Sequence, residues 1–308
     1  MARRKKPTSP SSEQAQSQTT PFCDIDLNRW RDYPEIETDS LWLFSGRERS
    51  NGHQLDYHGN CVPQILTQLL TRFTRREEIV LDLFLGSGTS AIEAANLGRR
   101  AVGVELKADL AQYVRDKLAE QGKAQATQIL QGDSSHPWTG KSIDHALAAL
   151  GEREAQFLFL HPPYADIIRF SDLPQDLSNA DGASAFIEQF ARVARLGFEK
   201  LAAGRFAGLV IGDKYENGRL IPLGFDCMQA MIEAGFICKS IIVKNITGNE
   251  RGKGRTGNLW RYRALKGGFY IFRHEYVMLF QKPSCAKSAR QRKKASMPPE
   301  EDSRAETR

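Results

Sequence analysis

The chain has 308 residues, of which 41% are hydrophobic, enough for one large α/β domain or two small ones. No stretch approaches the roughly 18 consecutive apolar residues of a membrane span, and no apolar segment follows the basic N-terminus, so a membrane protein and a secreted protein are both disfavoured. The five cysteines lack a C-x-x-C pair and the six histidines lack ligand spacing. This pattern argues against a metal site and favours a reducing, cytoplasmic location.

The net charge of +6 belongs to the two ends of the chain. Residues 1–20 and 283–308 each carry a net charge of +3, so the body between them is neutral. Both ends are rich in Ser, Gln, Lys and Pro, with little to bury. We predict two disordered basic tails, 1–20 and 283–308, around a single domain at 21–282.

Within the body, strand patterns alternate with helix patterns. After an irregular lead-in at 21–57, helices are predicted at 62–73, 89–97, 107–120, 141–150, 183–201 and 223–234, and strands at 79–84, 100–105, 127–131, 156–160, 206–211, 236–244 and 269–281. An acidic loop is predicted at 165–181. This alternation predicts a parallel sheet covered by helices on both faces, and Gly267-Gly268 suggests that the last strand returns antiparallel.

The first informative motif is the strand and turn at 81–90, LDLFLGSGTS. Gly86 and Gly88 allow a tight turn and a close approach of backbone to ligand. The turn has neither a third glycine at the dinucleotide spacing nor the Lys-Ser/Thr of a phosphate loop. Glu105 ends the next strand, where a carboxylate can accept both hydroxyls of a ribose. With Asp82 before the turn, these acids disfavour a polyphosphate and favour the cationic S-adenosylmethionine over NAD or ATP.

The second motif, His161-Pro162-Pro163-Tyr164, follows the buried strand Gln156 to Leu160. Its position is the carboxyl end of a strand, where open α/β sheets bind ligands. The two prolines remove two N–H donors, so the corner offers carbonyl groups that can accept hydrogen bonds from an exocyclic amine. Tyr164 offers a flat face for a stacked base.

Together these motifs resemble the DNA amino-methyltransferase family (adenine-N6/cytosine-N4), in the arrangement with the cofactor motif before the catalytic one. The likeness covers about residues 41 to 282, including a closing stretch, His274 to Phe280, similar to the family's last strand. It implies a Rossmann-like, S-adenosylmethionine-dependent fold with a seven-stranded, mostly parallel sheet and one antiparallel strand. The implied cofactor residues are His58, Asn60, Pro63, Asp82, Phe84, Gly86, Gly88, Thr89, Glu105 and Asp133, and the implied catalytic residues are His161, Pro162, Pro163 and Tyr164.

One position departs from the family pattern, because His161 stands where Asp, Asn or Ser is usual. A neutral imidazole can accept a hydrogen bond from the target amine, whereas imidazolium cannot. We interpret His161 as a working variant with an acid limb in its pH profile. The change leaves adenine N6, slightly favoured, and cytosine N4 both open. An RNA or protein-glutamine methyltransferase and a catalytically impaired DNA-binding relative also stay open.

A basic segment at 249–268, which we predict to be a loop between the last two strands, carries six Lys or Arg residues and one acid. Cations interleaved with aromatic side chains suit contact with phosphates and bases. The predicted DNA contacts are Arg251, Lys253, Arg255, Trp260, Arg261 and Arg263. The expected partner is double-stranded DNA in the nucleoid, with a homodimer and associated restriction or defence components left open.

Overall fold

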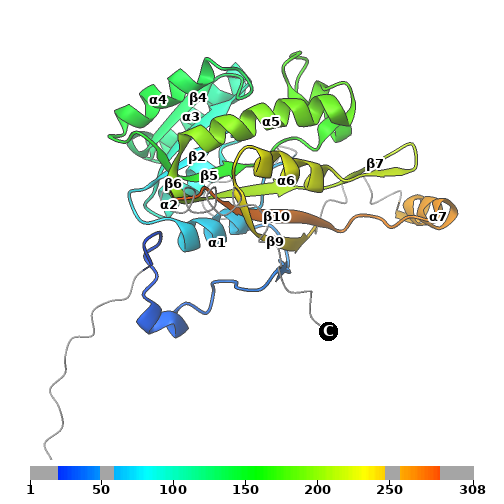
Figure 1. The fold of residues 1–308 in the computed structure, drawn as a ribbon, viewed down its shortest axis with the longest axis horizontal. Helices are drawn as coiled ribbons and strands as arrows, with labels where there is room; N and C mark the ends of the chain where they lie inside the picture. The colour runs from blue at the N-terminus through cyan, green and yellow to red at the C-terminus, as the bar shows by residue number, and fades with distance from the viewer. Residues whose placement is uncertain (1–19, 49–58, 247–256, 285–308) are drawn as a thin grey trace, which may run out of the picture.

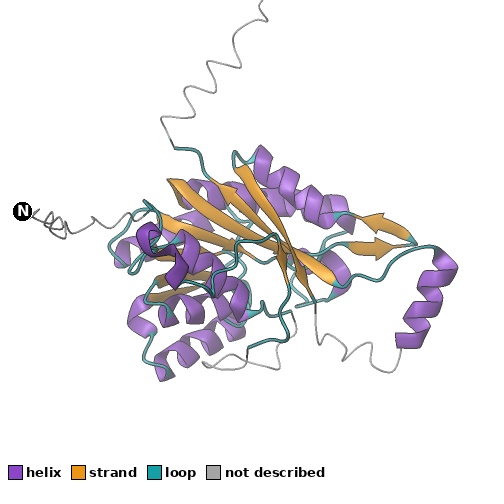
Figure 2. Ribbon diagram, turned by 90° about the horizontal axis from the view of Figure 1, so that it is seen from below, coloured by secondary structure: helices purple, strands orange, loops and turns teal. Residues whose placement is uncertain are grey.

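The computed structural model describes residues 20–48, 59–246 and 257–284. These residues form a central sheet with helices on both faces (Figures 1 and 2). The helices are α1 (Pro63–Phe73), α2 (Thr89–Asn96), α3 (Ala108–Glu120), α4 (Thr139–Ala149), α5 (Gly182–Lys200), α6 (Leu223–Glu233) and α7 (Gly257–Gly267). The strands are β1 (Leu41–Trp42), β2 (Ile79–Asp82), β3 (Arg100–Glu105), β4 (Thr127–Gln131), β5 (Ala155–Leu160), β6 (Leu201–Ile211), β7 (Lys214–Glu216), β8 (Arg219–Ile221), β9 (Ile237–Asn245) and β10 (His274–Gln281).

The main sheet has the order β1-β9-β10-β6-β5-β2-β3-β4. Strand β10 is antiparallel to both of its neighbours, and the other pairings are parallel. The mostly parallel sheet with one antiparallel strand is therefore confirmed. The predicted count of seven omitted β1, a two-residue edge strand that pairs with β9. A strand of two residues, Leu41 and Trp42, is too short to show strand periodicity in the sequence.

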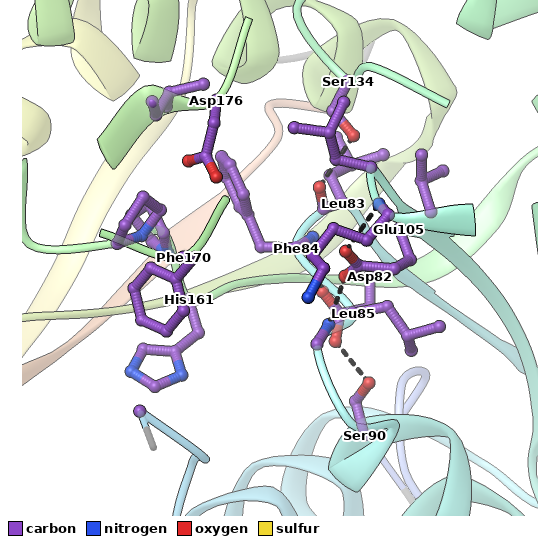
Figure 3. Close-up of a pocket in the computed structure, with 18 of the residues that line it drawn as sticks. Asp82, Leu83, Phe84, Leu85, Ser90, Glu105, Ser134, His161, Phe170 and Asp176 are labelled. Atoms are coloured by element: carbon purple, nitrogen blue, oxygen red, sulfur yellow. Dashed lines mark hydrogen bonds between the residues drawn. The ribbon is translucent and has the colours of Figure 1, made fainter. Parts of the chain in front are cut away.

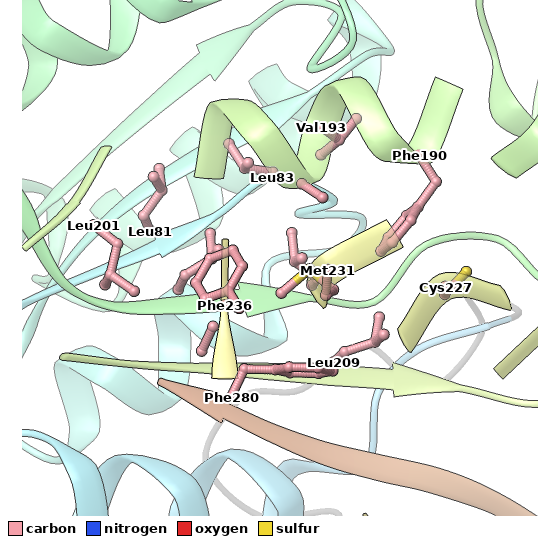
Figure 4. Close-up of a cluster of buried hydrophobic side chains, with 14 of the residues drawn as sticks. Leu81, Leu83, Phe190, Val193, Leu201, Leu209, Cys227, Met231, Phe236 and Phe280 are labelled. Atoms are coloured by element: carbon pink, nitrogen blue, oxygen red, sulfur yellow. The ribbon is translucent and has the colours of Figure 1, made fainter. Parts of the chain in front are cut away.

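Two hydrophobic clusters sandwich the sheet, and β2 shows why. Its residues are all buried, and they alternate between the faces: Ile79 and Leu81 contact one cluster, and Val80 the other. Helices α4, α5 and α6 cover the first cluster, part of which is shown in Figure 4, and α1, α2 and α3 cover the second. Burial on both faces explains the nearly unbroken apolar strands of the sequence.

The predicted elements differ from the observed ones mainly in two places. The segment 249–268 was predicted as a loop, but residues 257–267 form α7, since Leu259 to Lys266 contains mostly good helix formers and no internal glycine. Strands β7 and β8 form a separate hairpin after β6. Aromatic contacts join this hairpin to the segment that follows α7: the Tyr215 ring lies 4.8 Å from that of Phe269 and 4.9 Å from that of Phe272.

Three 3₁₀ helices complete the loops around the sheet, and a fourth precedes it: η1 (Leu27–Asp32), η2 (Ala124–Ala126), η3 (Ala165–Ile167) and η4 (Leu177–Asn179). In Figure 2, α7 and the β7–β8 hairpin extend beyond the end of the main sheet. Among the described residues, no helix combines the length and the apolar character that crossing a membrane requires. The predicted tails fall largely outside the described residues.

Candidate active site

The carboxyl ends of β2, β3, β4 and β5 border one cavity, as expected for an open α/β sheet (Figure 3). The cavity is lined by Gly59, Asn60, Cys61, Asp82, Leu83, Phe84, Leu85, Gly86, Thr89, Ser90, Val104, Glu105, Leu106, Lys107, Gly132, Asp133, Ser134, Phe159, His161, Pro162, Pro163, Phe170, Gln175, Asp176 and Leu177. In Figure 3, His161 and Phe170 lie on one side, and Asp82 and Glu105 on the other. Both sequence motifs therefore meet in one place.

The glycine turn after β2 is shaped by close contacts. Gly88 has a φ of +83°, and a Cβ atom there would lie 2.7 Å from Cγ1 of Val114. Only glycine fits such a position without strain. Gly88 precedes α2 as its N-cap, while Ser87 donates a hydrogen bond to Oδ1 of Asn60. The turn is thus tied to the segment before α1, where the sequence resemblance placed further cofactor residues.

Glu105 bridges the turn and its own strand end. Its Oε2 accepts a hydrogen bond from the Gly86 amide at 2.9 Å, and its Oε1 accepts one from the Lys107 amide at 2.9 Å. Burial raises the pKa of Glu105 to about 7, against the opposing effect of these two amides. Each carboxylate oxygen has further acceptor capacity, so an ionised Glu105 can still receive two hydroxyl groups.

Asp82 is buried at the end of β2 and holds the start of α2. Its carboxylate accepts hydrogen bonds from the Phe84 amide at 2.8 Å and from the Ser90 hydroxyl. Burial raises its pKa to about 6, despite these bonds. These bonds fix the turn, and Asp82, like Glu105, also lines the cavity.

Asp133 borders the opposite end of the cavity, after β4. Its Oδ1 accepts hydrogen bonds from the amide and the hydroxyl of Ser135, both at 2.8 Å. Ser134 donates to the carbonyl group of Leu83 at 2.7 Å, which links the ends of β4 and β2. An acid held in this way at the cavity wall can accept a hydrogen bond from an amino group.

The proline corner after β5 supplies another wall. His161, Pro162 and Pro163 line the cavity, whereas Tyr164 does not. A Cβ atom on Gly212 would lie 2.9 Å from Cε2 of Tyr164, so the tyrosine ring packs closely on that glycine. The Tyr164 hydroxyl donates to Oε2 of Glu275 at 2.7 Å. The stacking role of Tyr164 therefore stays a prediction, with one part of its ring already covered by protein.

The remaining predicted residues divide into three groups. Asn60, Phe84, Gly86 and Thr89 line the cavity, while Pro63 and Gly88 support it from the first turn of α1 and the N-cap of α2. Trp260, Arg261 and Arg263 lie on α7, where the Arg263 guanidinium lies 5.3 Å from the centre of the Trp260 ring. His58, Arg251, Lys253 and Arg255 lie outside the described residues.

The structure adds cavity residues that the motifs did not indicate, among them Phe170, Gln175 and Leu177. All three come from the acidic segment after the proline corner. Phe170 also packs on Gly59, where a Cβ atom would lie 2.8 Å from its Cζ. In the sequence, Phe170 is one of several apolar residues in a loop of mixed polarity, and this pattern does not reveal the direction of its side chain. No group of three metal-ligating side chains occurs among the described residues.

The arrangement suits S-adenosylmethionine. Its ribose fits the two acceptor oxygens of Glu105, its adenine amino group fits Asp133, and the glycine turn leaves room for backbone approach to the molecule between them. Four carboxyl groups line the cavity, those of Asp82, Glu105, Asp133 and Asp176, against one lysine, and this excess of acids tolerates a cation and disfavours a polyphosphate. The residues present therefore fit this cofactor.

Comparison with known proteins gives matches to family models and to solved structures. A family described as "DNA methylase" matches residues 3–116, and one described as "Conserved hypothetical protein 95" matches residues 64–197. Similar solved structures include TrmN from Thermus thermophilus (16% identity, 73% of this chain and 50% of that chain, TM-score 0.47). A methyltransferase from Pyrococcus furiosus is 15% identical, and the match covers 74% of this chain and 88% of that chain with a TM-score of 0.45.

A further similar structure is fibrillarin from Aeropyrum pernix with natively bound S-adenosyl-L-methionine. It is 13% identical, and the match covers 67% of this chain and 66% of that chain with a TM-score of 0.39. The chain spans half the length of the TrmN structure. The first family match includes the glycine turn and Glu105, and the second includes these and the proline corner. The resemblance to the DNA amino-methyltransferase family is thus confirmed by a family model over residues 3–116, which is less than half of the chain, and the fold is α/β with a mostly parallel sheet.

Proposed function

We propose that the chain methylates the exocyclic amine of a base flipped out of double-stranded DNA, with adenine N6 favoured over cytosine N4. The observation that carries the proposal is the meeting of His161, Pro162 and Pro163 with Glu105 in one cavity. A base inside a duplex cannot reach such a cavity, so it must leave the stack.

Methyl transfer to an amine requires the protein mainly to position the reactants and to stabilise charge electrostatically. S-adenosylmethionine supplies a methyl group made electrophilic by its sulfonium. The Pro162 carbonyl and a neutral His161 ring accept hydrogen bonds from the amine, which opposes conjugation of the nitrogen lone pair with the base and directs it at the methyl carbon. With the cofactor bound, the N–CH₃ bond would form as the S–CH₃ bond breaks, and the amine would release one proton to solvent.

His161 meets the requirement for a neutral acceptor. Burial lowers its pKa, as do the nearby charges of Lys244 and Arg47, whereas Glu275 raises it. The net effect keeps the imidazole neutral at physiological pH, so it can take the place of the usual Asp, Asn or Ser. The same reasoning predicts loss of activity on the acid side.

DNA is favoured as the substrate by the "DNA methylase" match and by the composition of α7. Arg261, Arg263 and Lys266 are exposed on this helix, and Tyr262 is 60% exposed. Cations can neutralise phosphates, while exposed planar side chains can stack on bases. Helix α7 lies beyond the end of the main sheet, which suits a contact made outside the cavity (Figure 2).

The test is transfer of labelled methyl groups to three substrates in parallel: duplex DNA, tRNA and a protein extract. The proposal expects label in DNA alone. Label in tRNA or in protein would replace it with one of the other methyltransferase functions. Cofactor binding by calorimetry without transfer to any DNA would indicate a catalytically impaired relative.

A further inference from the structure

A line of polar side chains runs from the cavity wall into the protein beneath the proline corner. His161 Nε2 lies 3.4 Å from the Tyr164 hydroxyl oxygen, and that hydroxyl donates to Oε2 of Glu275 at 2.7 Å. The other carboxylate oxygen of Glu275 accepts from Nζ of Lys244 at 2.8 Å. The side chains of Lys244 and Glu275 are only 5% and 13% exposed.

The strands explain why this ion pair is fixed. Glu275 on β10 is directly opposite Lys244 on β9 in the antiparallel ladder. A buried carboxylate without a partner would be costly, and the ammonium group offsets that cost. The ion pair therefore holds the Glu275 carboxylate in one place, where its two oxygens accept hydrogen bonds from Tyr164 and Lys244.

Counting protons along the line then fixes the state of the histidine. A tyrosine hydroxyl has one hydrogen, and here Glu275 receives it. The Tyr164 oxygen can therefore act only as an acceptor toward His161, so a hydrogen bond between these two groups requires the hydrogen on Nε2 of the histidine. In a neutral imidazole, Nδ1 is then the nitrogen with the free lone pair.

We propose that Glu275 is a positioning residue that acts through Tyr164 to hold His161 in the tautomer whose Nδ1 accepts the hydrogen bond from the target amine. This inference rests on the proposed function for its substrate, but the tautomer itself belongs to the free protein. It explains how a histidine replaces Asp, Asn or Ser at this corner. Asp, Asn and Ser always present an oxygen that can accept a hydrogen bond. An imidazole accepts only through a nitrogen that carries no hydrogen, so the tautomer must place that nitrogen toward the amine.

The charged and titratable groups around His161 come from several elements. Glu275 lies on β10, Lys244 on β9, and Arg47 on the segment after β1, and each acts electrostatically on the ring. The buried Cys61 thiol lies near the same groups, and burial raises its pKa, so it stays neutral. Below the pKa of His161, both ring nitrogens are protonated and no acceptor remains, which predicts an acid limb for transfer.

The direct test is ¹⁵N NMR of the histidine ring in the free, full-length protein, with His161→Asn to assign the signal. At pH 8 we expect a bare Nδ1 and a protonated Nε2. Tyr164→Phe removes the hydroxyl and should give a mixture of tautomers. A protonated Nδ1 in the unaltered protein would overturn the inference, whether or not the protein methylates DNA.

The kinetic test compares Glu275→Gln with Glu78→Gln. Glu78 also forms an ion pair, with the half-buried Arg205, but it lies just before β2, at the end of that strand away from the cavity. We expect Glu275→Gln to lower kcat by about tenfold or more, with KM for DNA and cofactor almost unchanged, and Glu78→Gln to leave kcat near that of the parent.

A second background separates positioning from general damage. In His161→Asn, whose amide oxygen accepts without a tautomer, Glu275→Gln should have little further effect and the acid limb should disappear. The double change Lys244→Met with Glu275→Gln guards against a misfolded variant, because it leaves no buried charge unpaired; it should fold and remain slow. Equal losses in both backgrounds would overturn the inference, while absence of transfer by the parent protein would count only against the proposed function.

Discussion

Cofactor binding should depend on pH through Glu105, and Glu105→Gln should abolish that dependence. In the free protein burial raises the pKa of Glu105 to about 7, from an ordinary value of 4.5. Two backbone amides already donate to its oxygens. Accepting two ribose hydroxyls as well requires the ionised form, since a protonated carboxyl has less acceptor capacity.

The magnitude follows from this difference in pKa. Raising the pKa from 4.5 to about 7 means that ionised Glu105 costs the folded protein about 3 kcal/mol. Between pH 4.5 and about 7, Glu105 is protonated in the folded protein and ionised in the unfolded chain. The free energy of unfolding of the cofactor-free protein therefore falls as the pH rises through this range. Bound hydroxyls favour the charged form, so affinity should fall up to about tenfold for each pH unit below 7.

The assay is isothermal titration calorimetry with S-adenosylmethionine between pH 6 and 8.5. The ratio of Kd between Glu105→Gln and the parent removes the cofactor's own titration, which is common to both. At pH 8 the variant should bind about 10- to 100-fold more weakly, because it loses hydrogen bonds to a charged group. Toward pH 6 the ratio should shrink. A ratio that stays constant across this range would refute the ribose-binding role of Glu105.

Three other changes test separate parts of the site. Tyr164→Ala should cut methyl transfer by about 100-fold or more, while calorimetry shows cofactor affinity retained; equal loss of both would refute its assignment to the transfer step. Gly88→Ala should lower the free energy of unfolding by about 1–3 kcal/mol in denaturant titrations, because of its φ of +83° and the 2.7 Å approach to Val114. The double change of Arg261 and Arg263 to Ala should weaken DNA binding to all sequences. In fluorescence anisotropy titrations, the slope of log K against log salt concentration should become shallower by about two; an unchanged slope would place the DNA elsewhere.

Much of the fold was predictable because the central strands are buried on both faces. The sequence pattern locates β2, β3, β4 and β5 within a residue or two, since apolar runs of that length end at turn residues. Short edge elements were not predictable. Leu41–Trp42 forms β1 only because β9 offers a free edge, a tertiary contact with no local signature.

The candidate site shows the same division. Asp82, Glu105 and the proline corner follow strand ends, so topology alone brings them together. Side-chain direction was not predictable in the same way: Tyr164 turns away from the cavity lining toward Glu275, a partner 111 residues away in the chain. Phe170 enters the wall because its loop folds back over Gly59, and loop conformation depends on contacts that are not local.

The most direct measurement is nucleoside mass spectrometry of duplex DNA incubated with the protein and S-adenosylmethionine, beside a Pro162→Ala, Tyr164→Ala control. The account predicts N6-methyladenine, or N4-methylcytosine if the cavity takes the smaller base, in the parent reaction and a severe loss in the control. Methylated DNA in equal amounts from both proteins, or a methyl group on a ring carbon in place of an exocyclic nitrogen, would contradict it.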